Sequence, residues 1–323
     1  MPVRPPAPIP IRRGRSTSLP ILSTPTPVET TLEFFNGLGG FADDGREYVT
    51  VLDGDRTTPA PWINVVANPD FGFQVSTEGS GYTWAENSRE NQITQWSNDP
   101  VVDPCGEAFY VRDEASGELW SPTAQPIRDG GTYVARHGRG YSRFQHQAHG
   151  IALDLLQFVP CADPIKISRL TLRNLTTRPR RLTITAYVEW VMGTRRGASA
   201  PFVTTAIDAE TGALVARNPW NNGFSGRVAF ADLAGRQTAW TADRTEFLGR
   251  NGSPAAPAAL LGRTPLGRRT GAGFDPCAAL QCTIDLAAGE AVDVVAFLGE
   301  CRTIEEARAL IGRWRSADLD AAF

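Results

Sequence analysis

The sequence predicts an all-β protein, a large antiparallel sandwich of two sheets, with one helix at its C-terminal end. Three observations predict this class. About sixteen short segments of strand-like composition follow one another between residues 46 and 298. Turn residues separate them, as in Asn68-Pro69-Asp70. A helical apolar period is clear only after residue 303, so the strands are joined by the short connections typical of antiparallel sheets.

The length of the chain is compatible with one large domain. It has 323 residues, 41% of them hydrophobic, and an all-β sandwich can reach this size. Residues 1–31 contain eight prolines and little that could form a core, so we expect a disordered leader. We place the β-sandwich domain at residues 32–302 and a linker helix at residues 303–323, because no repeat or boundary signal divides the sandwich region.

Two of the predicted strands carry patterns that bear on packing. In residues 181–191 apolar side chains alternate strictly, which predicts one buried face. In residues 165–174 the apolar face changes midway, which suggests a strand that bends or passes between layers. The predicted strands, in chain order, are Arg46–Asp53, Trp62–Asn68, Phe71–Thr77, Glu107–Arg112, Leu119–Ser121, Thr132–Arg136, Tyr141–Gln147, Ile151–Val159, Ile165–Asn174, Arg181–Val191, Phe202–Asp208, Ala213–Arg217, Arg227–Asp232, Thr238–Thr241, Ala278–Leu286 and Ala291–Leu298.

The C-terminal third breaks the rhythm of short strands twice. Residues 244–274 are rich in Gly, Pro and Arg and predict an excursion over one face of the sandwich. Thr303 can cap a helix, and Glu306 completes a capping box. The apolar stripe of that helix is formed by Ile304, Ala307, Leu310, Ile311 and Trp314. We expect part of this stripe to stay uncovered, as in a chain that continues into another domain.

Composition excludes several classes of protein. Net charge is −3, which disfavours a nucleic-acid partner. The five cysteines are odd in number and form no CxxC pair, which predicts reduced thiols, a cytoplasmic location and no zinc site. No apolar run reaches membrane-spanning length. Arg12-Arg13 resembles the start of an export signal, but Pro20 interrupts the apolar patch that follows, so we predict none.

The stretch from Gly81 to Pro122 mixes aromatic rings with amides, carboxylates and guanidinium groups. A protein core does not need this mixture, because each buried polar group must then find a partner. Sugar recognition does, since rings cover the apolar face of a pyranose while planar polar groups reach its hydroxyls. The alternative is a structural loop anchored by its aromatic residues. The candidate binding residues here are Tyr82, Trp84, Asn87, Arg89, Glu90, Trp96, Asn98 and Asp99.

Catalytic signatures are weak along the chain. His146 and His149 are three residues apart, so on a strand they face opposite sides and cannot chelate one ion. Acidic residues are plentiful, among them Glu86, Asp103 and Glu107, but spacing in a loop cannot establish the separation that a glycosidase needs. No GxSxG motif occurs. The residues alone do not define a catalytic site.

Four long segments together resemble one family, glycoside hydrolase family 94, in its N-terminal β-sandwich. They are WINVVANPDFGFQVSTEGSGYTWAENSRENQITQWSNDPVVDPCGEAFYVRD, ARHGRGYSRFQHQAHGIALDLLQFVP, KISRLTLRNLTTRPRRLTITAYVEWV and RVAFADLAGRQTAWTADRTEFLGRNG. The similarity spans about residues 32–315 and is strongest to the cyclic β-1,2-glucan synthase branch. It implies a "super-sandwich" like that of galactose mutarotase, followed in the full enzyme by a linker helix and a helical barrel that carries the catalytic Asp.

This resemblance implies a carbohydrate-binding accessory domain that shapes an active-site entrance and a subunit interface. No residue here matches the catalytic Asp, so we expect the chain to be inactive alone, to need no cofactor, and to have as partners a β-glucan or oligosaccharide, a helical-barrel domain and a second copy. The second motif block adds Arg136, His137, Tyr141 and Arg143 to the binding residues. Two alternatives remain: a structural or dimerising module, and an aldose 1-epimerase using His137, His146 or His149 with Glu107 or Glu189.

Overall fold

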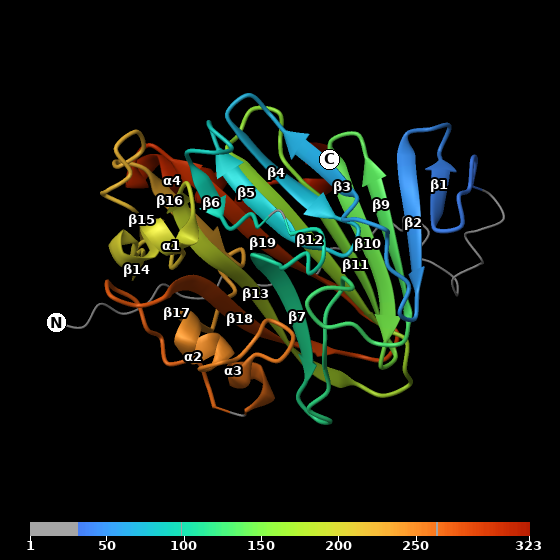
Figure 1. Cartoon of the computed structure of the whole chain (residues 1–323). Helices are drawn as coiled ribbons and strands as arrows, with labels where there is room; N and C mark the ends of the chain where they lie inside the picture. Colours follow the sequence, from blue (N-terminus) through green and yellow to red (C-terminus); the bar gives the residue numbers. More distant parts are fainter. Residues whose placement is uncertain (1–31, 98, 263) are drawn as a thin grey trace.

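Two antiparallel sheets pack face to face in the computed structural model, which describes residues 32–97, 99–262 and 264–323 (Figure 1). In these residues the first sheet has ten strands, in spatial order β1 (Gly39–Ala42), β2 (Glu47–Asp53), β9 (Thr132–Gly138), β10 (Tyr141–Ala148), β11 (Ile151–Phe158), β12 (Ile165–Asn174), β19 (Ala291–Cys301), β16 (Val228–Asp232), β15 (Leu214–Arg217) and β14 (Thr204–Ile207). The all-β, two-sheet prediction is confirmed.

The second sheet is forked. Its continuous part runs in the order β17 (Ala239–Asp243), β18 (Pro276–Leu286), β13 (Arg180–Gly193), β6 (Gln92–Thr94), β5 (Gly81–Ala85), β4 (Phe71–Ser76) and β3 (Ile63–Ala67). β18 lines one edge of β13. Along the other edge, β7 (Glu107–Asp113) pairs with residues 182–188 and β6 with residues 190–193. β8 (Leu119–Trp120) extends the β7 branch.

The main core lies between the sheets and follows from the alternation of side chains along each strand. Leu182 and Ile184 of β13 point into it, opposite Leu170 and Leu172 of β12. β12 keeps one continuous register with β11 and β19 and stays in the first sheet, so the prediction that it passes between layers is wrong. The apolar face changes along β12 because Ile165 and Ile167 pack with α4 on the outer face, whereas Leu170 and Leu172 pack in the main core between the sheets.

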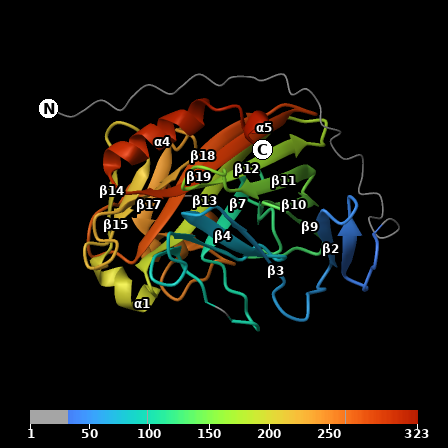
Figure 2. The ribbon, with the colours of Figure 1, turned by 90° about the horizontal axis from the view of Figure 1, so that it is seen from above.

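Helices cover the outer face of each sheet in part. α4 (Ile304–Ser316) lies across the first sheet and buries Ala307, Leu310, Ile311 and Trp314 against strands that include β12 (Figure 2). Thr303 caps it by accepting from the backbone N–H of Glu306 at 3.2 Å, as predicted. The expectation that the apolar stripe stays uncovered is wrong, since the stripe packs on this chain's own sheet. α5 (Leu319–Ala322) follows.

The predicted excursion at residues 244–274 covers the outer face of the second sheet. It contains α2 (Arg244–Leu248) and α3 (Ala258–Leu261), and its Phe247 packs against Tyr110 and Tyr187. α1 (Arg196–Ser199) and the 3-10 turn η2 (Ala200–Phe202) follow β13. Short helices thus occur where the sequence predicted strands or irregular chain. Among the described helices, none has the length and apolarity needed to cross a membrane.

Candidate functional site

The region predicted as one aromatic loop is largely a hairpin in the second sheet. Tyr82 and Trp84 lie on β5, and β6 follows after a turn at residues 86–91. Because side chains alternate along β5, Thr83 and Ala85 face the core while the two aromatic rings face outward. Sequence reasoning missed both strands.

The outward rings form a stack on this face. The Tyr82 ring lies 5.2 Å from that of Trp84 and 5.6 Å from that of Trp96, nearly parallel to the latter. Trp84 packs against Gly72 of β4, where an added Cβ would come within 2.5 Å of the Trp84 Cζ2 atom. Trp96 closes the stack and is 45% exposed. The stack is therefore fixed on its sheet side and open to solvent at Trp96.

Neighbouring strands extend this face with residues that sequence reasoning did not select. Val65 and Gln74 stand beside Tyr82 in register across β3 and β4. Ile63 and Val65 are 50% and 55% exposed. The sequence could have pointed to Ile63 and Val65, because they alternate with Asn64 along β3. β3 is an edge strand, and these two apolar residues lie on its outer face. We call Ile63, Val65, Gln74, Tyr82, Trp84 and Trp96 the β3–β5 surface.

The polar candidates of this region serve local turns. The side-chain oxygen of Asn87 accepts from the backbone N–H groups of Arg89 and Glu90, at 3.0 and 2.9 Å. Asp99 accepts in the same way from Val101 and Val102. Asn98 lies outside the described residues. Asn87, Arg89 and Glu90 are exposed, and Asp99 is half-buried.

The second predicted block splits between the two faces of the first sheet. Arg136, Tyr141 and Arg143 point outward, where Glu47 accepts from Arg136 at 3.0 Å and from the Tyr141 hydroxyl at 2.5 Å. Arg143 makes a bidentate ion pair with Asp154. These cations are matched by carboxylates, and they lie on the opposite side of the sandwich from the β3–β5 surface. The two blocks therefore do not form one pocket.

The histidines are held by structural contacts. His137 points inward, with its Nδ1 atom 3.0 Å from Ser142 Oγ, and burial lowers its pKa to about 4. His146 is stacked on Tyr133 and lies 3.0 Å from Asp129 Oδ2. His149 is exposed in a turn and packs on Trp120.

The carboxylates of the epimerase alternative have other partners. Glu189 accepts from Tyr187 and Arg244, at 2.8 and 2.7 Å. Glu107 pairs with Lys166, as described next. Within the described residues neither is hydrogen-bonded to a histidine.

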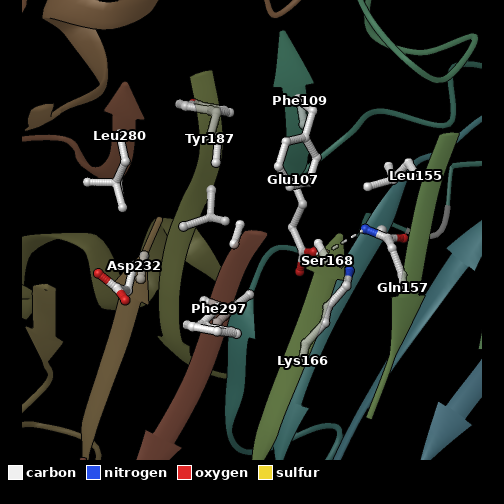
Figure 3. Close-up of a pocket in the computed structure, with 18 of the residues that line it drawn as sticks. Glu107, Phe109, Leu155, Gln157, Lys166, Ser168, Tyr187, Asp232, Leu280 and Phe297 are labelled. Atoms are coloured by element: carbon white, nitrogen blue, oxygen red, sulfur yellow. Dashed lines mark hydrogen bonds and ion pairs between the residues drawn. The ribbon is translucent and has the colours of Figure 1, made fainter. Parts of the chain in front are cut away.

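A polar cluster lies inside the sandwich, at the fork between β6 and β7 (Figure 3). Lys166 of β12 donates to Glu107 Oε2 at 2.7 Å, and Glu107 Oε1 accepts from Thr83 and Thr94 at 2.6 and 2.5 Å. The pKa of Glu107 is lowered from its usual value. Burial by itself would raise this pKa, but the charge of Lys166 and these hydrogen bonds outweigh the effect of burial.

The cavity beside this pair is small. Gln157 and Ser168 line it together with the two charged residues, and Gln157 Oε1 has no hydrogen-bond partner among the described residues. The cavity has a volume of about 50 Å³, which leaves room for ordered water. A pocket for a ligand needs a volume of several hundred Å³. The cluster therefore joins the two sheets and is too confined to be a sugar site.

Comparisons with known proteins agree with this architecture. The model of the glycosyl hydrolase 94 supersandwich domain matches residues 46–317. Cyclic beta-(1,2)-glucan synthase NdvB of Rhizobium meliloti (strain 1021) is 42% identical over 292 residues, covering 90% of this chain and 10% of that protein. N,N'-diacetylchitobiose phosphorylase of Vibrio furnissii is 27% identical over 273 residues, covering 81% of this chain and 33% of that protein.

A bacterial glucoamylase solved with acarbose superposes with a TM-score of 0.52 at 6% identity, over 85% of this chain and 39% of that one. This likeness concerns the fold alone. The chain spans a tenth and a third, respectively, of the two relatives given above.

Proposed function

This chain belongs to the glycosyl hydrolase 94 supersandwich family, and from that membership we propose that it is the carbohydrate-binding accessory sandwich of a β-glucan-processing enzyme. The names of its relatives support the substrate class, since one is a cyclic beta-(1,2)-glucan synthase and another an N,N'-diacetylchitobiose phosphorylase. In both relatives the matching region is a minor part of a longer chain, which supports an accessory role beside a separate catalytic domain.

The β3–β5 surface is the observation that carries this proposal. A stacked Tyr82–Trp96 pair beside exposed Ile63 and Val65 leaves an apolar area open on a rigid sheet. Such an area marks a binding surface more often than a solvated face. We infer that it faces the sugar-bearing side of a helical-barrel catalytic domain, with Trp96 nearest to the glucan.

Catalysis is assigned to that partner domain. The inward carboxylate Glu107 is engaged by Lys166 and two threonines, and Glu189 by Tyr187 and two arginines. Neither is free to act as an acid or base on a bound sugar. A cytoplasmic location, supported by five unbridged cysteines, and a homodimer whose interface includes this domain complete the proposal.

Affinity electrophoresis through a gel that contains soluble β-1,2-glucan tests the function. We expect the 323-residue chain to migrate more slowly than it does in a gel without glucan, and the Trp96→Ala variant to be retarded less. Unchanged migration of the wild-type chain at every glucan concentration would contradict the proposal. Light scattering after gel filtration tests the homodimer separately.

A further inference from the structure

A second open site lies at one end of the sandwich, away from the β3–β5 surface. It is a groove of about 490 Å³ between the β5–β6 turn, the α1–η2 segment and the β15–β16 loop. Figure 1 shows β6, α1 and β15 at the left of the molecule. A volume of this size falls within the range of small-molecule sites. Its lining residues are Glu90, Gly193, Thr194, Ala198, Ser199, Phe202, Asn218, Trp220, Asn221, Asn222, Gly223 and Phe224.

The floor of the groove is an irregular end of β13. The register between β13 and β6 shifts after Trp190, and Met192 adopts a φ of 51°, which is unusual for a side chain of this kind. Two amides from the β15–β16 loop hold the displaced Met192 carbonyl, Asn218 at 2.9 Å and Asn221 at 3.2 Å. Strained backbone kept in place by dedicated side chains is typical of functional sites.

An aromatic shelf forms one wall. The rings of Phe202 and Trp220 lie 4.9 Å apart. Asn218 fixes the start of the loop by accepting from the Trp220 N–H at 3.0 Å. The indole is nevertheless 68% exposed. A core or packing role does not account for so much exposed ring surface on a loop tied to the sheet.

The charge of the lining defines the ligand class. Glu90 is the one charged side chain among the twelve lining residues, and none of them is Lys, Arg or His. An anionic ligand such as a phosphate ester is therefore disfavoured. The side-chain amide of Asn222 and the hydroxyl of Thr194 are exposed beside the shelf. Aromatic surface next to uncharged donors and acceptors suits a neutral polyhydroxyl compound.

We propose that this groove binds a hexopyranose unit of a β-linked glucan, with the sugar stacked on Trp220 and its hydroxyls bonded to Glu90 and Asn222. This inference rests on the proposed function for the identity of the glucan. The groove would give the glucan a second point of contact with the protein, at the end of the sandwich, in addition to the β3–β5 surface. The sequence around it, Asn218-Pro-Trp-Asn-Asn222, has the same mixture of ring and amides as the region around Trp84.

The test follows individual indole N–H signals by NMR while short linear β-1,2-glucooligosaccharides are added to the 323-residue chain. Trp220→Phe and Trp96→Phe variants assign the two signals. We expect the Trp220 signal to shift in a saturable manner and Trp220→Ala to weaken binding about tenfold. Trp220→Phe should recover part of the affinity. Because Trp220 is exposed, the melting temperature of the alanine variant should stay near that of the wild type, which confirms an intact fold.

Trp96→Ala is the matched control, since it also removes an exposed indole, but on the β3–β5 surface. Saccharide binding that shifts only the Trp96 signal and survives Trp220→Ala would overturn the groove inference and leave the proposed function intact. Absence of any saccharide-induced shift at tens of millimolar ligand would overturn both. A Trp220 shift produced equally by inorganic phosphate would also overturn the assignment to a neutral sugar.

Discussion

The ammonium group of Lys166 lies 2.7 Å from the Glu107 carboxylate in the interior of the sandwich, and this pair joins β12 of the first sheet to β7 of the second. Removing one partner leaves an uncompensated buried charge. We expect Lys166→Met to cost roughly 3–5 kcal/mol of unfolding free energy, and addition of Glu107→Gln to recover most of the loss. Urea denaturation measures both.

The exposed pair Arg181–Asp285 is the control for this experiment, because its atoms are 3.5 Å apart in solvent and Arg181→Ala should cost under about 1 kcal/mol. The pH dependence has a definite sign. The pKa of Glu107 is held below its usual 4.5 in the folded chain, so its contribution is present above pH 4.5 and lost as the pH falls. Equal losses for the buried and exposed variants would contradict this account.

Glu300 and His137 should give opposite pH dependences of stability. Burial raises the pKa of Glu300 to about 7, although hydrogen bonds from Asn91 and Arg227 oppose the shift. Glu300 therefore costs stability as the pH rises from 4.5 to 7. Burial lowers the pKa of His137 to about 4, so its favourable contribution is complete above pH 6.5 and is lost as the pH falls toward 4.

Thermal melts of two variants from pH 4 to 8 separate these effects. Relative to wild type, Glu300→Gln should gain stability as the pH rises, by up to roughly 3 kcal/mol. Relative to wild type, His137→Gln should gain stability as the pH falls. Parallel pH profiles for the two variants and the wild type would show that neither group titrates as described.

Tryptophan substitutions should separate the solvent-facing stack from the core. Trp120 is 1% exposed, and its replacement by alanine should cost roughly 3–5 kcal/mol. Trp96→Ala should cost under about 1 kcal/mol, with Trp84→Ala between the two because its ring packs against Gly72. Chemical denaturation gives the order. A large loss for Trp96→Ala would mean that the β3–β5 surface is structural.

One cysteine should react rapidly in the native chain. Cys161 is exposed, whereas Cys105, Cys277, Cys282 and Cys301 are buried. Burial raises the pKa of Cys105 and Cys301 to about 12 and that of Cys282 to about 11, which suppresses the reactive thiolate. Titration with a thiol reagent should find one fast thiol, lost in Cys161→Ser, and five after denaturation without reductant. Fewer than five would indicate a bridge.

The chain should not accelerate the mutarotation of fresh α-glucose. His146 is buried against Tyr133 and Asp129, and the half-buried His137 points inward to Ser142, so neither faces a sugar in solvent. Polarimetry should give the uncatalysed rate. Acceleration that is lost in His146→Ala or in His149→Ala, the exposed histidine, would reverse the assignment.

Period and capping predicted much of this fold. Strict alternation in residues 181–191 predicted β13, and Thr303 with Glu306 predicted the start of α4. β5 and β6 were missed because inward Thr83 and Thr94 are polar. Their partner is Glu107, which belongs to another strand, so only the folded chain shows why polar residues point inward there.

The candidate site was harder to predict than the strands. Neighbours in sequence such as Arg136 and His137 go to opposite faces, because alternation on β9 separates them. Conversely, Val65, Gln74 and Tyr82 come together only through strand register. Trp220 carried a readable signal, a ring between amides, but no partner residue was adjacent to it in sequence.

Strand pairing along β13 determines which parts of the groove can move quickly and which cannot. β18 holds one edge over residues 180–189, and β7 and β6 share the other, so the amides in the doubly paired part of this strand should exchange with solvent only on rare, large openings of the sheet. The floor at Met192 is the end of that strand and is held by Asn218 and Asn221, while the walls belong largely to loops, which move in nanoseconds to microseconds. A ligand therefore meets a floor that is already in place, and only the walls must adjust to it.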